Sequence, residues 1–119
     1  MKKVLVIQED LIILKILERL VSLNNYECKA IPSLSDLSIE DQESNFNFII
    51  TDILFEGIAP LQFVAQVQEI LTHENLLIVT SMGQDKIKQE IFALSGISGF
   101  YAVPIDLDEI DATLKAYNE

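Results

Sequence analysis

Residues 4–10 read VLVIQED, four apolar residues that end abruptly at three polar ones. A short and largely β-branched apolar run of this kind is typical of a central parallel strand that is covered on both faces. Three further runs have the same character, over residues 46–51, 76–80 and 100–103, and residues 26–31 alternate between apolar and polar side chains. The sequence therefore predicts five strands.

Segments with helical signals separate these strands. Ile12, Ile16, Leu20 and Leu23 recur at helical spacing before Asn24, which closes the first of them. Because strands and helices alternate through short connections, we expect right-handed crossovers and a parallel sheet with helices on both faces. The predicted helices cover residues 12–23, 34–41 with Ser33 as N-cap, 60–71 with a proline near its start, 85–95 before Gly96, and 107–117 with Asp106 as N-cap.

Composition limits what this chain can do. Half of its 119 residues are apolar, which predicts one domain over residues 1–119 with a single core. It carries 8 Lys and Arg against 19 Asp and Glu, a formal charge of −11 that would repel nucleic acids and anionic lipid surfaces. No apolar run is long enough to span a bilayer, and the one cysteine, Cys28, cannot form an internal disulfide. We therefore expect a soluble cytoplasmic protein that binds neither nucleic acid nor membrane.

The ends of the predicted strands carry the chemistry. In an open doubly wound sheet, ligands bind beyond the carboxyl ends of the strands, where the strand order reverses. Glu9 follows the first strand, Asp52 follows the third, and Thr80 ends the fourth. Carboxylates that converge in a crevice repel each other unless one is protonated or a hard cation such as Mg²⁺ neutralises them. Glu9 and Asp10 fit an alternative equally well, in which they stabilise the N-terminus of the first helix.

Four motifs follow one another in a recognisable order. They are VLVIQED at 4–10, IITDILF at 49–55, VTSMG at 79–83 and GFYAVP at 99–104. The second motif is followed by three residues that belong to the same pattern, Gly57, Leu61 and Phe63.

Over nearly its whole length the chain resembles the receiver domains of two-component response regulators, the CheY-like group. The resemblance implies an α/β fold with a five-stranded parallel sheet, the doubly wound, flavodoxin-like (βα)5 arrangement with strand order 2-1-3-4-5. It implies that Asp52 is the phosphoacceptor, that Thr80 hydrogen-bonds the phosphoryl group and acts as the switch residue, and that Phe100 is the aromatic switch residue. Such a chain is not an enzyme beyond its own phosphorylation and dephosphorylation.

The resemblance also implies a metal site and a set of partners. Mg²⁺ would be held by Glu9, Asp52 and the backbone carbonyl of Leu54, with Asp10 and Gln8 as further candidates. The phosphoryl group would come from a histidine kinase or phosphotransfer protein, and a downstream protein would read the result. Related receivers dimerise or dock through the face formed by the last two helices and the last strand, where Tyr101 and Ile105 are candidate contacts.

Two departures from the family pattern open an alternative. Gln8 stands where the family has an acid, and Val103 stands where it has a lysine that pairs with the phosphoryl group. No substitute is evident: Lys86 and Lys88 lie in or near the start of the predicted helix over residues 85–95 and could reach inward, but we expect them to be solvated. The alternative is a pseudo-receiver, a protein-binding module that works without phosphorylation.

Overall fold

Five parallel strands form one sheet in the computed structural model, which describes residues 2–81, 85–102 and 106–118. The order is β2-β1-β3-β4-β5, so the predicted topology is confirmed. The strands are β1 (Lys3–Ile7), β2 (Glu27–Ile31), β3 (Asn45–Thr51), β4 (Thr72–Thr80) and β5 (Ile97–Ala102).

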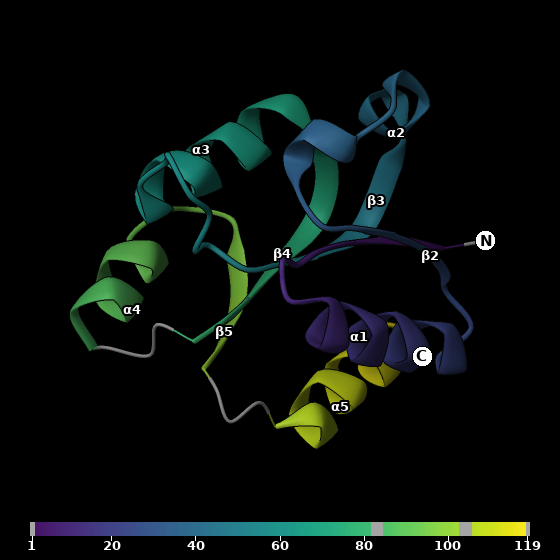
Figure 1. Ribbon diagram of the computed structural model, residues 1–119. Helices are drawn as coiled ribbons and strands as arrows, with labels where there is room; N and C mark the ends of the chain where they lie inside the picture. Colours follow the sequence, from purple (N-terminus) through teal and green to yellow (C-terminus); the bar gives the residue numbers. More distant parts are fainter. Residues whose placement is uncertain (1, 82–84, 103–105, 119) are drawn as a thin grey trace.

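Helices cover both faces of this sheet (Figure 1). On one face lie α1 and α5, and on the other lie α3 and α4, with α2 on the same side as α3. No helix among the described residues is long and apolar enough to cross a membrane. The helices are α1 (Leu11–Leu23), α2 (Ile39–Glu43), α3 (Pro60–Ile70), α4 (Asp85–Phe92) and α5 (Leu107–Asn118).

The central strands carry apolar runs, residues 4–7 in β1, 48–50 in β3 and 76–79 in β4, because each strand contributes to two cores. Successive side chains of a strand point to opposite faces of the sheet. Thus Leu5 and Ile7 of β1 lie in the core under α3 and α4, whereas Val4 and Val6 lie in the core under α1 and α5. All four are fully buried, as expected of a strand with both faces covered.

The predicted helix over residues 34–41 is wrong in its bounds. A 3-10 turn over Leu34–Asp36 comes first, and α2 begins only after Ser38. The Ser38 side chain accepts from the backbone N–H of Asp41 at 3.1 Å, and the Asp41 carboxylate accepts from the Ser38 N–H at 3.2 Å. This capping box fixes the start of α2, whereas the predicted cap, Ser33, makes no hydrogen bond of that kind.

Two further boundaries differ from the prediction. β4 begins at Thr72, so His73 lies in a strand rather than near a helix end, and its Nδ1 lies 2.9 Å from the carbonyl oxygen of Leu71. α4 ends at Phe92, and the chain turns through Gly96, whose φ of +88° is readily adopted only by glycine.

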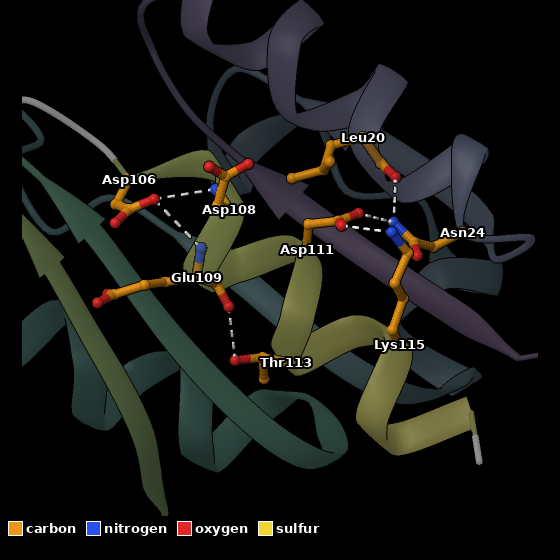
Figure 2. A network of polar contacts seen from close by, with 8 residues as sticks. All are labelled: Leu20, Asn24, Asp106, Asp108, Glu109, Asp111, Thr113 and Lys115. Carbon is orange, nitrogen blue, oxygen red and sulfur yellow. Dashed lines mark hydrogen bonds and ion pairs between the residues drawn. The ribbon is translucent and has the colours of Figure 1, made fainter.

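A polar network joins α1 to α5 (Figure 2). The Asn24 side chain donates from Nδ2 to the Leu20 carbonyl oxygen at 2.9 Å and to Asp111 Oδ1 at 2.8 Å. Lys115 donates to the other oxygen of Asp111 at 2.6 Å. Asp106 caps α5 as predicted, since its Oδ1 accepts from the backbone N–H of two residues in the first turn.

Candidate functional site

The register of β1 against β3 places Gln8 beside Asp52. Ile7 and Thr51 are partners at the ends of these strands, and the Asp52 N–H donates to the Ile7 carbonyl oxygen at 3.0 Å. The chain leaves β1 for β2 on one side and returns to β3 on the other, so the strand order reverses between β1 and β3. This is the place where an open α/β sheet binds ligands.

Asp52 borders two cavities at this edge of the sheet. One has a volume of about 100 Å³ and the other of about 330 Å³, and they share Gln8, Asp10, Asp52 and Ser81 in their walls. The smaller cavity is completed by Ile13, Val79 and Thr80, and the larger one by Glu9 and Leu54.

The predicted site residues lie together at the ends of β1, β3 and β4, with the exception of Phe100, which lies on β5 and lines neither cavity. The cavities are also lined by Ser81, Ile13 and Val79, for which no role in the site was predicted. The signal for Ser81 was its position directly after Thr80. Ile13 and Val79 could not be recognised from the sequence, because apolar side chains that only line a cavity have no chemical signature.

Backbone amides hold the Asp52 carboxylate. The side chain is only 9% exposed, and its Oδ1 accepts from the N–H groups of Ile53 at 2.6 Å and Leu54 at 3.1 Å. The Thr51 hydroxyl donates to the Asp52 carbonyl oxygen at 2.8 Å, which further ties down the strand end. Within the described part of the chain, Oδ2 accepts no hydrogen bond, so this second oxygen is left for a ligand.

Asp10 serves as the N-cap of α1. Its Oδ1 accepts from the N–H groups of Ile12 at 2.9 Å and Ile13 at 3.3 Å. A carboxylate in this position satisfies free amide groups of the first turn and interacts favourably with the helix dipole. Of the two roles considered for Asp10, the structure supports the helix N-terminus.

The donors at this edge fit a resident metal ion poorly. Among residues 2–81, 85–102 and 106–118, no group of three or more His, Cys, Asp and Glu side chains is placed to hold a metal ion. Asp10 is engaged by the first turn of α1, Glu9 is exposed, and Gln8 carries no charge. A single buried carboxylate, Asp52, remains, and the charge of one carboxylate does not require a divalent cation for neutralisation.

The two predicted switch residues lie in different surroundings. Thr80 ends β4, is 1% exposed and lines the smaller cavity together with Asp52. Phe100 lies on β5 and packs against the core under α3 and α4, with its ring centroid 6.1 Å from that of Phe92. Phe100 is not among the residues that line either cavity.

Among the described residues, no Lys or Arg lines either of the two cavities. Lys86 and Lys88 of α4 are exposed, and neither lines either of the two cavities. The position where the family has its lysine, Val103, lies outside the described residues, as do Gly83, Pro104 and Ile105.

No protein-family model matches this chain, and no curated protein matches it. Among solved structures, chemotaxis protein CheY4 of Vibrio cholerae is 22% identical over 98% of each chain, with a TM-score of 0.75. A CheY-like receiver domain from Methanospirillum hungatei is 15% identical over 98% of this chain and 93% of its own, with a TM-score of 0.78.

A third solved structure is a response regulator from Burkholderia pseudomallei that contains a phosphorylated aspartic acid, a calcium ion and citrate. It is 16% identical over 99% of this chain and 73% of its own, with a TM-score of 0.75. At such identities the likeness concerns the fold. The chain thus has the fold of the CheY-like receiver domains of response regulators.

Proposed function

We propose that this chain is a phosphorelay receiver in which Asp52 accepts a phosphoryl group from the phosphohistidine of a histidine kinase or phosphotransfer protein. The observation that supports this function is the state of the Asp52 carboxylate. One oxygen is fixed by two loop amides, while the other is left for the cavity that Thr80 shares. A solved response regulator of the same fold carries a phosphorylated aspartic acid.

We expect an in-line transfer. Asp52 Oδ2 attacks phosphorus, the P–N bond of the phosphohistidine breaks, and the electron pair of that bond stays on the imidazole. Phosphoryl transfer depends mainly on positioning and on stabilising the charge of the three phosphoryl oxygens. The Thr80 hydroxyl, at the wall of the same cavity, would donate to one of these oxygens and so report the modified state.

A small phosphodonor tests the proposal directly. The purified chain is incubated with acetyl phosphate, once with Mg²⁺ and once with EDTA, and followed by intact mass spectrometry. We expect the mass gain of one phosphoryl group, which peptide mapping assigns to Asp52 and which is absent from Asp52→Asn. The asparagine keeps the shape of the side chain and removes the nucleophilic carboxylate. No mass gain under forcing conditions in either buffer would reject the proposal.

A second candidate function is a pseudo-receiver that binds a protein partner without being phosphorylated. The observations that favour it are the neutral Gln8 and the engagement of Asp10 in the helix cap. For a pseudo-receiver we expect no mass gain in either buffer and no heat on titration with Mg²⁺ or Mn²⁺. The double variant Gln8→Asp with Val103→Lys should then gain Mg²⁺-dependent phosphorylation, because it restores the family's acid and its cation.

The proposed output surface is the face formed by α4, β5 and α5. Phe92 of α4 is 45% exposed and Leu107 of α5 is 37% exposed, so apolar side chains are available there. Tyr101 is half-buried, and its hydroxyl lies 3.3 Å from Thr113 Oγ1 on α5. A downstream protein or a second copy of the chain would dock on this face. Light scattering with and without phosphorylation distinguishes a homodimer from a monomer.

A further inference from the structure

Gln8 is a buried amide whose donor end has no protein partner among the described residues. The side chain is 3% exposed, and its Oε1 accepts from the backbone N–H of Asp10 at 3.1 Å. Since a backbone N–H can only donate, this contact fixes which end of the amide is the oxygen. Within the described residues, Nε2 donates to no protein group.

The unpartnered nitrogen lies open to the site. In the described part of the chain, no side-chain nitrogen or oxygen that is sealed from solvent lacks a hydrogen-bond partner. Gln8 Nε2 therefore retains access to solvent, and Gln8 lines both cavities that border Asp52. The register of β1 and β3 puts Gln8 and Asp52 side by side, and both residues line the same two cavities.

A neutral donor and a carboxylate have opposite effects at this position. A carboxylate at position 8 would repel a phosphoryl dianion on Asp52 unless a cation lay between them. An amide N–H₂ attracts that dianion directly through a charge-assisted hydrogen bond. Glutamine in place of the family's acid at position 8 thus weakens a metal site and also makes the metal less necessary.

We infer that Gln8 is a positioning residue that donates from Nε2 to a phosphoryl oxygen on Asp52, so that phosphorylation of this chain proceeds without a divalent cation. This inference rests on the proposed function of Asp52. Neutral donors for the phosphoryl group would come from Gln8 and Thr80, while the loop amides at Ile53 and Leu54 hold the other oxygen of Asp52. Preorganised donors of this kind stabilise developing negative charge without reorganisation.

The reaction with acetyl phosphate is balanced without a metal or a proton. The free Asp52 oxygen forms a bond to phosphorus while the bond from phosphorus to the acetate oxygen breaks. Acetate leaves with the electron pair of that bond. The product is the aspartyl phosphate, whose terminal oxygens would accept from Gln8 Nε2 and the Thr80 hydroxyl.

The test compares phosphorylation rates in EDTA and in Mg²⁺ for the wild-type chain and three variants. Gln8→Met removes the donor at similar length and adds no charge, Gln8→Asp restores the family's acid, and Gln66→Met changes an exposed glutamine of α3 as a matched control. Thermal melting verifies that each variant is folded.

We expect the wild-type and Gln66→Met rates in EDTA to lie within about threefold of their rates in Mg²⁺. Gln8→Met should be slower by about 10- to 100-fold in both buffers, the range for one hydrogen bond to a charged acceptor. Gln8→Asp should be equally slow in EDTA and recover in Mg²⁺. If Gln8 had a purely structural role, Gln8→Asp would not make the phosphorylation rate depend on Mg²⁺.

A spectroscopic measurement is independent of the rates. In the ¹⁵N-labelled chain, the side-chain amide signal that is lost in Gln8→Met should shift when Asp52 is phosphorylated in EDTA, and the Gln66 signal should not. Phosphorylation of the wild type in Mg²⁺ alone, or an unmoved Gln8 signal, would overturn the inference and leave the proposed function standing. No phosphorylation in either buffer would overturn both.

Discussion

The Asn24 side-chain nitrogen lies 2.8 Å from Asp111 Oδ1, and this hydrogen bond joins the end of α1 to the middle of α5. Asn24 is only 6% exposed, so its side of the contact is shielded from solvent. Hydrogen bonds from Asn24 and then from Lys115 lower the pKa of Asp111, because both stabilise the charged carboxylate.

This pKa shift predicts an acid-dependent loss of stability. Since the pKa of Asp111 is lower in the folded chain than in the unfolded one, the unfolded chain binds the proton first as the pH falls. The contribution of Asp111 is therefore complete above the ordinary carboxyl pKa of about 3.9 and is lost as the pH falls through the folded value. Urea unfolding should show Asp111→Asn to be less stable than the wild type at pH 7, with a difference that shrinks toward pH 3.

The control for Asp111 is an exposed acid that lacks such contacts. Glu69→Gln removes an exposed carboxylate of α3 for which no ion pair or hydrogen bond occurs in the described part of the structure. The difference in the free energy of unfolding between Glu69→Gln and the wild type should not shrink as the pH falls from 7 toward 3. Equal pH dependence of the two variants would contradict the role assigned to the contact between α1 and α5.

The two apolar sides of α1 differ in what they contribute to stability. Leu17 is 1% exposed and packs in the core under α1 and α5, whereas Ile12 is 73% exposed. Leu17→Ala should therefore lower the free energy of unfolding by about 2–5 kcal/mol, and Ile12→Ala should change it by less than about 0.5 kcal/mol. Urea denaturation at one pH measures both, and similar losses would contradict the orientation of the helix.

The orientation of α1 shows how far periodicity predicts a fold. The spacing of Ile12, Ile16 and Leu23 correctly predicted a helix, but these side chains are exposed, and Leu14, Leu17 and Val21 are the buried ones. The helix carries two apolar stripes at similar spacing. Only the position of the sheet and of α5 decides which stripe is covered, and a sequence pattern does not contain that position.

The site was more predictable than this helix because strand ends converge by topology. Once the strand order was expected, Gln8, Asp52 and Thr80 had to meet at one edge of the sheet. The direction of each polar group was not predictable in the same way. That Asp10 caps α1 and that the Gln8 oxygen faces the Asp10 N–H depend on local backbone angles, which residue types alone do not fix.

Cys28 should be a poorly reactive thiol. Burial, with a smaller contribution from the negative charge of Glu18, raises its pKa from 9.0 to about 12. The thiolate fraction at pH 8 is therefore about a thousandfold below that of an unshifted thiol, and the thiolate is the reactive form. Alkylation by iodoacetamide at pH 8 should be far slower for the folded chain than for the chain in urea. Equal rates would show that the thiol is open to solvent.

Two substitutions of Asp10 separate its role as a helix cap from a role as a metal ligand. Asparagine is as good an N-cap as aspartate, because its side-chain oxygen accepts the same amide hydrogen bonds, whereas alanine has no acceptor. Asp10→Ala should lower the free energy of unfolding by about 1 kcal/mol, and Asp10→Asn should stay within about 0.5 kcal/mol of the wild type. If the cap is the main role, Asp10→Asn should also keep the wild-type rate of phosphorylation by acetyl phosphate in EDTA and in Mg²⁺. A stable Asp10→Asn variant that loses only the rate in Mg²⁺ would instead make this carboxylate a metal ligand, and the charge of Asp10, rather than its hydrogen bonds to α1, would then be what the site requires.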